Sequence, residues 1–99
     1  MEQFERTDPS TNARVEIQVF DITPAAERLD EYRIVRLALS DGRHYETAFW
    51  RDPQQRGAHW WEEPGMVIVN DLTTDLILLA LDDILEQGTV DEAFEQKQS

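Results

Sequence analysis

The segment 50–61 gathers side chains of the types that dominate binding sites. It holds three tryptophans, two arginines and one histidine in twelve residues. Tryptophan and arginine are enriched at binding hot spots, and tryptophan stacks well on cations and flat rings. We therefore predict a recognition surface there, for a protein or for a small anionic or aromatic ligand. Its members are Trp50, Arg51, Arg56, His59, Trp60 and Trp61.

A structural interpretation of the same tryptophans stays open beside the functional one. The segment 52–65 can fold back so that its tryptophans cover a sheet face formed by Tyr32, Ile34 and Trp50, because bulky apolar residues usually belong to a core. Both interpretations hold together if one of Trp60 and Trp61 is buried and the other is presented.

A second candidate surface is acidic. Residues 62–96 contain ten acidic residues and no basic one, which accounts for most of the net charge of −12. Asp75, Asp82, Asp83 and Glu86 fall on the outer side of a helix in this part of the chain. Surface charge of one sign attracts and steers partners of the other sign, so this surface predicts a basic protein partner. The alternative is adaptation to a salty cytoplasm, in which the acidity has no meaning for a partner.

Catalytic and metal-binding signals are weak. His44 and Glu46 point the same way from one strand, but acid–base catalysis also needs a pocket and a third group. The carboxylates of Asp82, Asp83 and Glu86 lack the spacing of a calcium loop. The chain has no cysteine, which excludes disulfides and thiolate–zinc sites, and it contains no glycine-rich phosphate loop. We predict no catalytic residue, no metal and no cofactor, and we do not favour an enzyme.

The elements that must position these residues follow from periodicity. Apolar alternation predicts strands over 13–19, 32–39 and 43–51, and a short apolar run predicts a fourth over 66–69. A short helix is expected to begin at Thr23 and Pro24. A three-residue Ser-Asp-Gly loop at 40–42 sets Leu37 opposite Tyr45 and Arg36 opposite Glu46. The segment 52–65 is expected to be a long irregular connection.

The main helix is expected to begin after a cap at Asn70, Asp71 or Thr73 and to end at Gln87, before Gly88. Its apolar residues span an arc of about 200°, wider than one sheet face needs. This width predicts self-association, most simply as a two-fold dimer. A last short helix opens with a capping box at 89–92.

The fold class is therefore α+β. We expect an antiparallel β-meander of three to four strands, with one main C-terminal helix packed on one face and a short final helix. Residues 1–12 form a flexible lead-in, residues 13–95 a single α+β domain, and residues 96–99 a frayed tail.

These features favour a small acidic interaction protein that is not an enzyme, of the inhibitor, immunity or adaptor type. It would associate with itself and present its negative surface to a basic protein. Two alternatives stay open: a small-ligand-binding or accessory enzymatic domain that uses segment 50–61, and a salt-adapted protein. The negative charge argues against nucleic-acid binding. No apolar run reaches the length of a membrane span, so a cytoplasmic location is expected.

Overall fold

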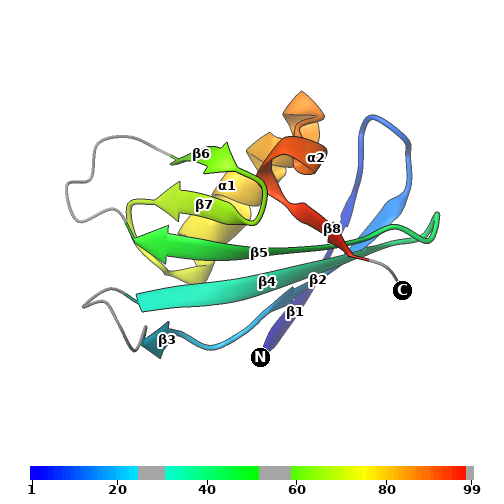
Figure 1. Cartoon of the computed structure of the whole chain (residues 1–99). Helices are drawn as coiled ribbons and strands as arrows, with labels where there is room; N and C mark the ends of the chain where they lie inside the picture. The colour runs from blue at the N-terminus through cyan, green and yellow to red at the C-terminus, as the bar shows by residue number, and fades with distance from the viewer. Residues whose placement is uncertain (25–30, 52–58, 98–99) are drawn as a thin grey trace.

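The computed structural model describes residues 1–24, 31–51 and 59–97, which form one mixed sheet with two helices on one side (Figure 1). The strands are β1 (Glu2–Thr7), β2 (Arg14–Val19), β3 (Thr23–Pro24), β4 (Glu31–Leu39), β5 (His44–Arg51), β6 (His59–Glu63), β7 (Met66–Val69) and β8 (Glu95–Lys97). The helices are α1 (Thr74–Gln87) and α2 (Val90–Ala93). The predicted α+β class with a main helix near the C-terminus is confirmed, whereas the expected three to four strands are too few.

The hairpin between β4 and β5 has the predicted register. Leu37 pairs with Tyr45 and Arg36 with Glu46, and the loop closes with the backbone N–H of Leu39 donating to the carbonyl of Arg43. Gly42 has φ +96°, a left-handed conformation that glycine adopts without a steric penalty. The three-residue loop therefore determines which residues of both strands face the core.

The predicted meander is confirmed for its first three strands, because β2, β4 and β5 pair antiparallel in chain order, and it is wrong for the fourth strand. The strand order is β1-β2-β4-β5-β7-β6, with β3 beside β4 and β8 beside β5. Strand β7 runs parallel to β5, and β6 pairs antiparallel with the far side of β7. The second half of β5 thus borders β7, and its first half borders β8. Pairing between segments far apart in the chain leaves no local pattern in the sequence.

Three segments expected to lack strands contain them. Strand β1 lies within the expected lead-in of 1–12, β6 lies within the expected irregular connection of 52–65, and β8 extends from residue 95 into the expected tail of 96–99. These strands are polar or aromatic and lack regular apolar alternation, because each pairs at or near an edge of the sheet. Thr23 and Pro24 pair with β4 instead of starting a helix; residues 25–30 and 52–58 lie outside the described residues.

Helix α1 has the predicted ends. The backbone N–H of Leu76 donates to the side chain of Thr73, the N-cap. Gly88 ends the helix in a left-handed conformation with φ +70°. Helix α2 begins after Thr89, but the predicted capping box does not form, because the hydroxyl of Thr89 donates to the carbonyl of Ile84 in α1 instead.

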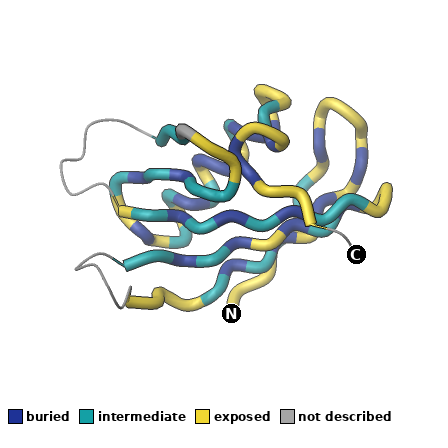
Figure 2. Tube along the Cα trace, in the orientation of Figure 1, coloured by how far each residue is buried: buried dark blue, intermediate teal, exposed yellow. Residues whose placement is uncertain are grey.

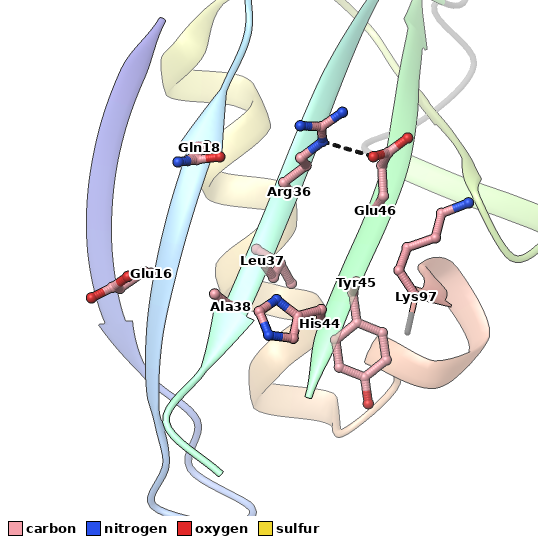
Figure 3. A pocket seen from close by; sticks show the side chains of 9 residues that line it. All are labelled: Glu16, Gln18, Arg36, Leu37, Ala38, His44, Tyr45, Glu46 and Lys97. Atoms are coloured by element: carbon pink, nitrogen blue, oxygen red, sulfur yellow. Dashed lines mark hydrogen bonds and ion pairs between the residues drawn. The ribbon is translucent and has the colours of Figure 1, made fainter. Parts of the chain in front are cut away.

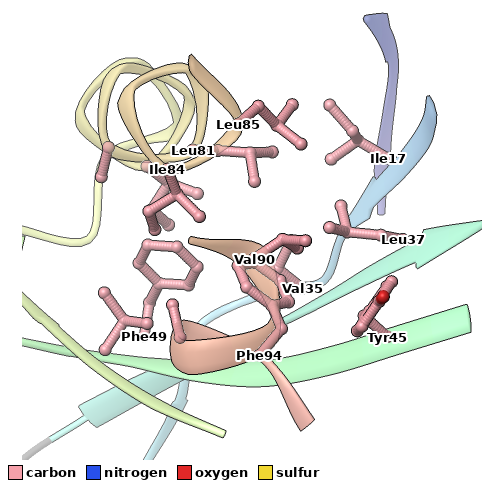
Figure 4. Packing of buried hydrophobic residues seen from close by; sticks show 14 of the residues in the cluster. Ile17, Val35, Leu37, Tyr45, Phe49, Leu81, Ile84, Leu85, Val90 and Phe94 are labelled. Atoms are coloured by element: carbon pink, nitrogen blue, oxygen red, sulfur yellow. The ribbon is translucent and has the colours of Figure 1, made fainter. Parts of the chain in front are cut away.

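The hydrophobic core lies between the helices and one face of the sheet (Figure 4). Ile77, Leu81 and Ile84 of α1 are fully buried there. Val90 and Phe94, which follow the turn after α1, are buried in the same cluster, between α1 and the sheet. The wide apolar arc is thus largely covered within one chain, so the width of the arc no longer supports self-association.

The opposite face of the sheet carries no helix within the described ranges. Residues on this face are half-buried or exposed, and they alternate with buried residues along β2, β4 and β5 (Figure 2). We call this the open face. It combines an apolar end near Tyr32 and Trp50 with a polar end near Arg36 and His44.

Candidate functional site

The predicted aromatic and cationic surface of segment 50–61 is divided between the two faces of the sheet. Trp50 and Trp60 both pair with Ile68, so all three share the open face. Trp61 pairs with the buried Val67 and packs against the core on the helix side. One of the two adjacent tryptophans therefore packs against the core and the other lies on the open face.

His59 belongs with Trp61 on the helix side. Its ring stacks on the indole of Trp61, with centroids 6.4 Å apart and planes 15° apart. Its Nε2 lies 2.9 Å from Oδ2 of Asp83 in α1. His59 and Asp83, which the sequence assigns to two different surfaces, therefore contact each other and hold edge strand β6 against α1.

The two predicted arginines do not complete a cluster. Arg51 is exposed at the end of β5, on the helix side of the sheet, whereas Trp50 faces the other way. Arg56 lies outside the described residues. The structure thus separates Trp50 and Trp60 from His59, Trp61 and Arg51.

The predicted acidic side chains do share the outer side of α1. Asp75 and Glu86 are exposed and make no ion pair with any part of the chain that the structure describes. Asp82 accepts a hydrogen bond of 3.0 Å from Nε of Arg6 in β1, and Asp83 contacts His59. About half of the expected negative surface is therefore paired within the chain.

An exposed leucine lies among these carboxylates. Leu79 exposes 66% of its surface, the most of any large apolar residue in the described ranges. Asp75 precedes it by four residues, and Asp82 and Asp83 follow it by three and four, so they are its neighbours on the helix. We call Asp75, Leu79, Asp82, Asp83 and Glu86 the acidic surface of α1.

A depression that was not predicted from the sequence lies on the polar end of the open face (Figure 3). Its volume is about 420 Å³, and Ala38 of β4 forms part of its floor. Nε of Arg36 donates to Glu46 at 2.8 Å along one side, and the guanidinium also lies 5.0 Å from the ring centroid of Phe20. The remaining lining residues are Glu16, Gln18, Leu37, His44, Tyr45 and Lys97.

The predicted register contains the signal for this depression. It places Ala38 beside His44 and between the longer side chains of two neighbouring strands. A small residue in that position leaves a hollow. The contribution of Lys97 to the lining could not be predicted from the sequence, because Lys97 lies in the unexpected strand β8, which pairs with β5.

A buried arginine that the sequence did not single out joins the sheet to the start of α1. Arg33 is 8% exposed and points to the helix side. Its Nε donates to the carbonyl of Phe20 at 2.7 Å, and its Nη1 donates to the carbonyl of Leu72 and the hydroxyl of Thr74 at 3.0 and 3.1 Å. These bonds satisfy the buried cation and fix the N-terminus of α1 over β4.

A second buried polar group joins β5 to α2. The hydroxyl of Tyr45, a residue that is 2% exposed, donates to Oδ1 of Asp91 at 2.7 Å. Nη1 of Arg43 donates to the same hydroxyl at 3.3 Å. Burial and then the Asp91 carboxylate raise the pKa of Tyr45.

A hydrogen bond from Arg43 lowers the pKa of Asp41, which lies at the tip of the hairpin.

The described residues contain no group of three or more His, Asp or Glu side chains arranged to hold a metal ion. Within the same ranges, neither helix has both the length and the apolar character needed to cross a bilayer.

Comparison of the chain with models of known families, with curated proteins and with solved structures finds no match of any of the three kinds.

Proposed function

We propose that this protein is a non-enzymatic interaction protein that presents the acidic surface of α1 to a basic protein. The observation that carries the proposal is the exposure of Leu79 among carboxylates on the main helix. A large apolar side chain that lies 66% in water contributes little to the fold of its own chain. It can contribute to binding when a partner covers it.

Charge complements this apolar contact. Helix α1 contains four acidic residues and no basic one. Asp75 and Glu86 lie one turn before and two turns after Leu79, which places carboxylates on both sides of it along the helix. A partner that fits has an apolar pocket for Leu79 and basic residues around that pocket, an arrangement in which complementary charge provides orientation and association rate.

The experiment uses the purified full chain as bait in the lysate of the cells that carry its gene. Captured basic proteins are identified and purified, and their affinity for the bait is measured by calorimetry at low and high salt. We expect Leu79→Ser to weaken binding by about 30-fold, the loss that corresponds to a binding hot spot of about 2 kcal/mol. Asp75→Asn with Glu86→Gln should lower the association rate and the dependence on salt.

Ile22 supplies a matched control, since it is also apolar and 48% exposed but lies outside α1. Ile22→Ser should leave the affinity unchanged. An affinity of the Leu79→Ser variant equal to that of the wild type contradicts the proposal, and so does an affinity that does not change with salt concentration. The absence of any basic protein among the captured proteins contradicts it as well.

A second candidate function is small-ligand binding in the depression around Ala38. The specific observation is the composition of its lining, which contains the carboxylates of Glu16 and Glu46 and the cations of Arg36 and Lys97. Such a lining suits a zwitterion. Amino acids titrated into labelled protein should shift the amide signals around Ala38, and Ala38→Leu should abolish those shifts by filling the hollow; unchanged spectra at millimolar ligand would exclude this function.

A further inference from the structure

Strand β1 is an edge at which the sheet can be extended. The described sheet ends at β1 on one side and at β6 on the other. Strand β6 has a register shift between Trp61 and Glu63, whereas β1 pairs with β2 without interruption from Glu2 to Thr7. A regular edge strand exposes backbone donors and acceptors to which another strand can add, and a bulge obstructs such addition.

Helix α1 follows this edge and is attached to it at two points. The hydroxyl of Thr74 donates to the carboxylate of Glu2, and Nε of Arg6 donates to Asp82 at 3.0 Å. Thr74 and Asp82 lie about two turns apart on one side of the helix. Glu2 and Arg6 lie on the helix side of β1, so helix and strand run side by side.

Between these two polar contacts lies an apolar pair. Leu78 is midway between Thr74 and Asp82, and Phe4 is midway between Glu2 and Arg6. Both Phe4 and Leu78 are half-buried, and both pack against the rim of the core. This edge therefore presents an incompletely covered apolar strip next to the free side of β1.

We propose that the occupant of this edge is a second copy of the chain, paired antiparallel through β1 about a two-fold axis at Phe4. Each Phe4 then faces Phe4 of the partner subunit. Each Glu2 faces Arg6 of the partner subunit, and each Gln3 faces Glu5 of the partner subunit. The two sheets become one continuous sheet, and the interface is closed because the same strand serves both copies.

The charges of β1 select this register over its neighbours. An axis at Glu5 opposes Glu5 to its own copy, and an axis at Arg6 does the same with Arg6, and like charges directly opposite are destabilising. A register shift of one residue between the two copies would place Phe4 of the partner subunit on the face opposite to Phe4 of the first copy. With the axis at Phe4, both ends of the pairing have opposite charges on the helix side. Charges on an edge strand commonly prevent pairing with other strands, but here the charges of one copy complement those of the other copy.

Substitution of Gln3 tests the register without disturbing the fold, because Gln3 is exposed. Gln3→Lys adds two attractions to Glu5 of the partner subunit, and Gln3→Glu adds two repulsions. At about 0.2–1 kcal/mol for each cross-strand pair, the dimer dissociation constant should fall by about 2- to 30-fold in the first variant and rise by a similar factor in the second. Sedimentation equilibrium measures both.

A cysteine variant tests the axis. The chain has no cysteine, and directly opposed residues of antiparallel strands lie about 4.5–5.5 Å apart at Cα, which suits a disulfide. Phe4→Cys should therefore give a covalent dimer on mild oxidation. The control Glu16→Cys, on the adjacent strand, should stay monomeric under denaturing electrophoresis.

A wild-type chain that sediments as a monomer at several hundred micromolar overturns the proposal. So do equal dissociation constants for the Gln3→Lys and Gln3→Glu variants. Neither result bears on the basic partner of α1, because Gln3 and Phe4 lie outside the acidic surface of α1.

Discussion

Removal of the hydrogen bond between Tyr45 and Asp91 should measurably destabilise the fold. The Tyr45 hydroxyl is buried and its 2.7 Å bond ends on a carboxylate, and a hydrogen bond to a charged group contributes about 1.5–3 kcal/mol. In Tyr45→Phe the exposed Asp91 carboxylate is hydrated instead, so the free energy of unfolding should fall by about 1.5–3 kcal/mol. Since about 1 kcal/mol moves the midpoint of a domain of this size by roughly 4–8 °C, the change in Tm is readily measured.

The assay is a double-mutant cycle by urea unfolding with Tyr45→Phe, Asp91→Ala and the pair. In Asp91→Ala the Tyr45 proton loses its acceptor inside the protein, which costs about 1–3 kcal/mol. The double variant should be less destabilised than the sum of the single variants, with a coupling of about 1–2 kcal/mol for groups in direct contact. A coupling below about 0.5 kcal/mol, the error within which distant sites add, would refute the assigned role of this bond.

Two further predictions concern solution conditions. Because the pKa of Tyr45 is raised in the folded state, its contribution to stability should be fully present below the unfolded pKa of about 10 and be lost as pH rises through the folded pKa. Urea unfolding between pH 9 and 11 should show this loss in the wild type and a smaller one in Tyr45→Phe. In rising KCl, the free energy of unfolding should increase and level off near 1 M, where the Debye length is about 3 Å, because screening relieves the repulsion of a net charge of −12. A continued steep increase at several molar KCl would favour the salt-adapted interpretation.

Local sequence determined the parts of the fold that local interactions control. Gly42 and the three-residue loop were sufficient to predict the pairing of Arg36 with Glu46. Thr73 and Gly88 were sufficient for the ends of α1. In each case the residues involved are neighbours in the chain, so their side-chain and backbone preferences act directly on the geometry.

The remaining features depend on contacts between distant segments. Strand β1 has one apolar residue, Phe4, and it forms a strand because its backbone pairs with β2. His59 and Trp61 are placed on the helix side of the sheet only once β6 pairs with β7. The burial of Arg33 depends on carbonyls supplied by Phe20, just after β2, and by Leu72, just before α1. No periodicity in the chain encodes these pairings.

The position of β5 between early and late segments affects how the protein folds. Strands β1, β2 and β4 precede β5, but both of its outer neighbours, β7 and β8, follow it. The hydroxyl of Thr47 in β5 donates to the carbonyl of Ala93, 46 residues away. Contacts this distant in the chain slow folding, because loop closure must come before the contact can form. During synthesis, β5 therefore exposes one side until the C-terminal residues emerge, and this side is where nascent chains would first aggregate.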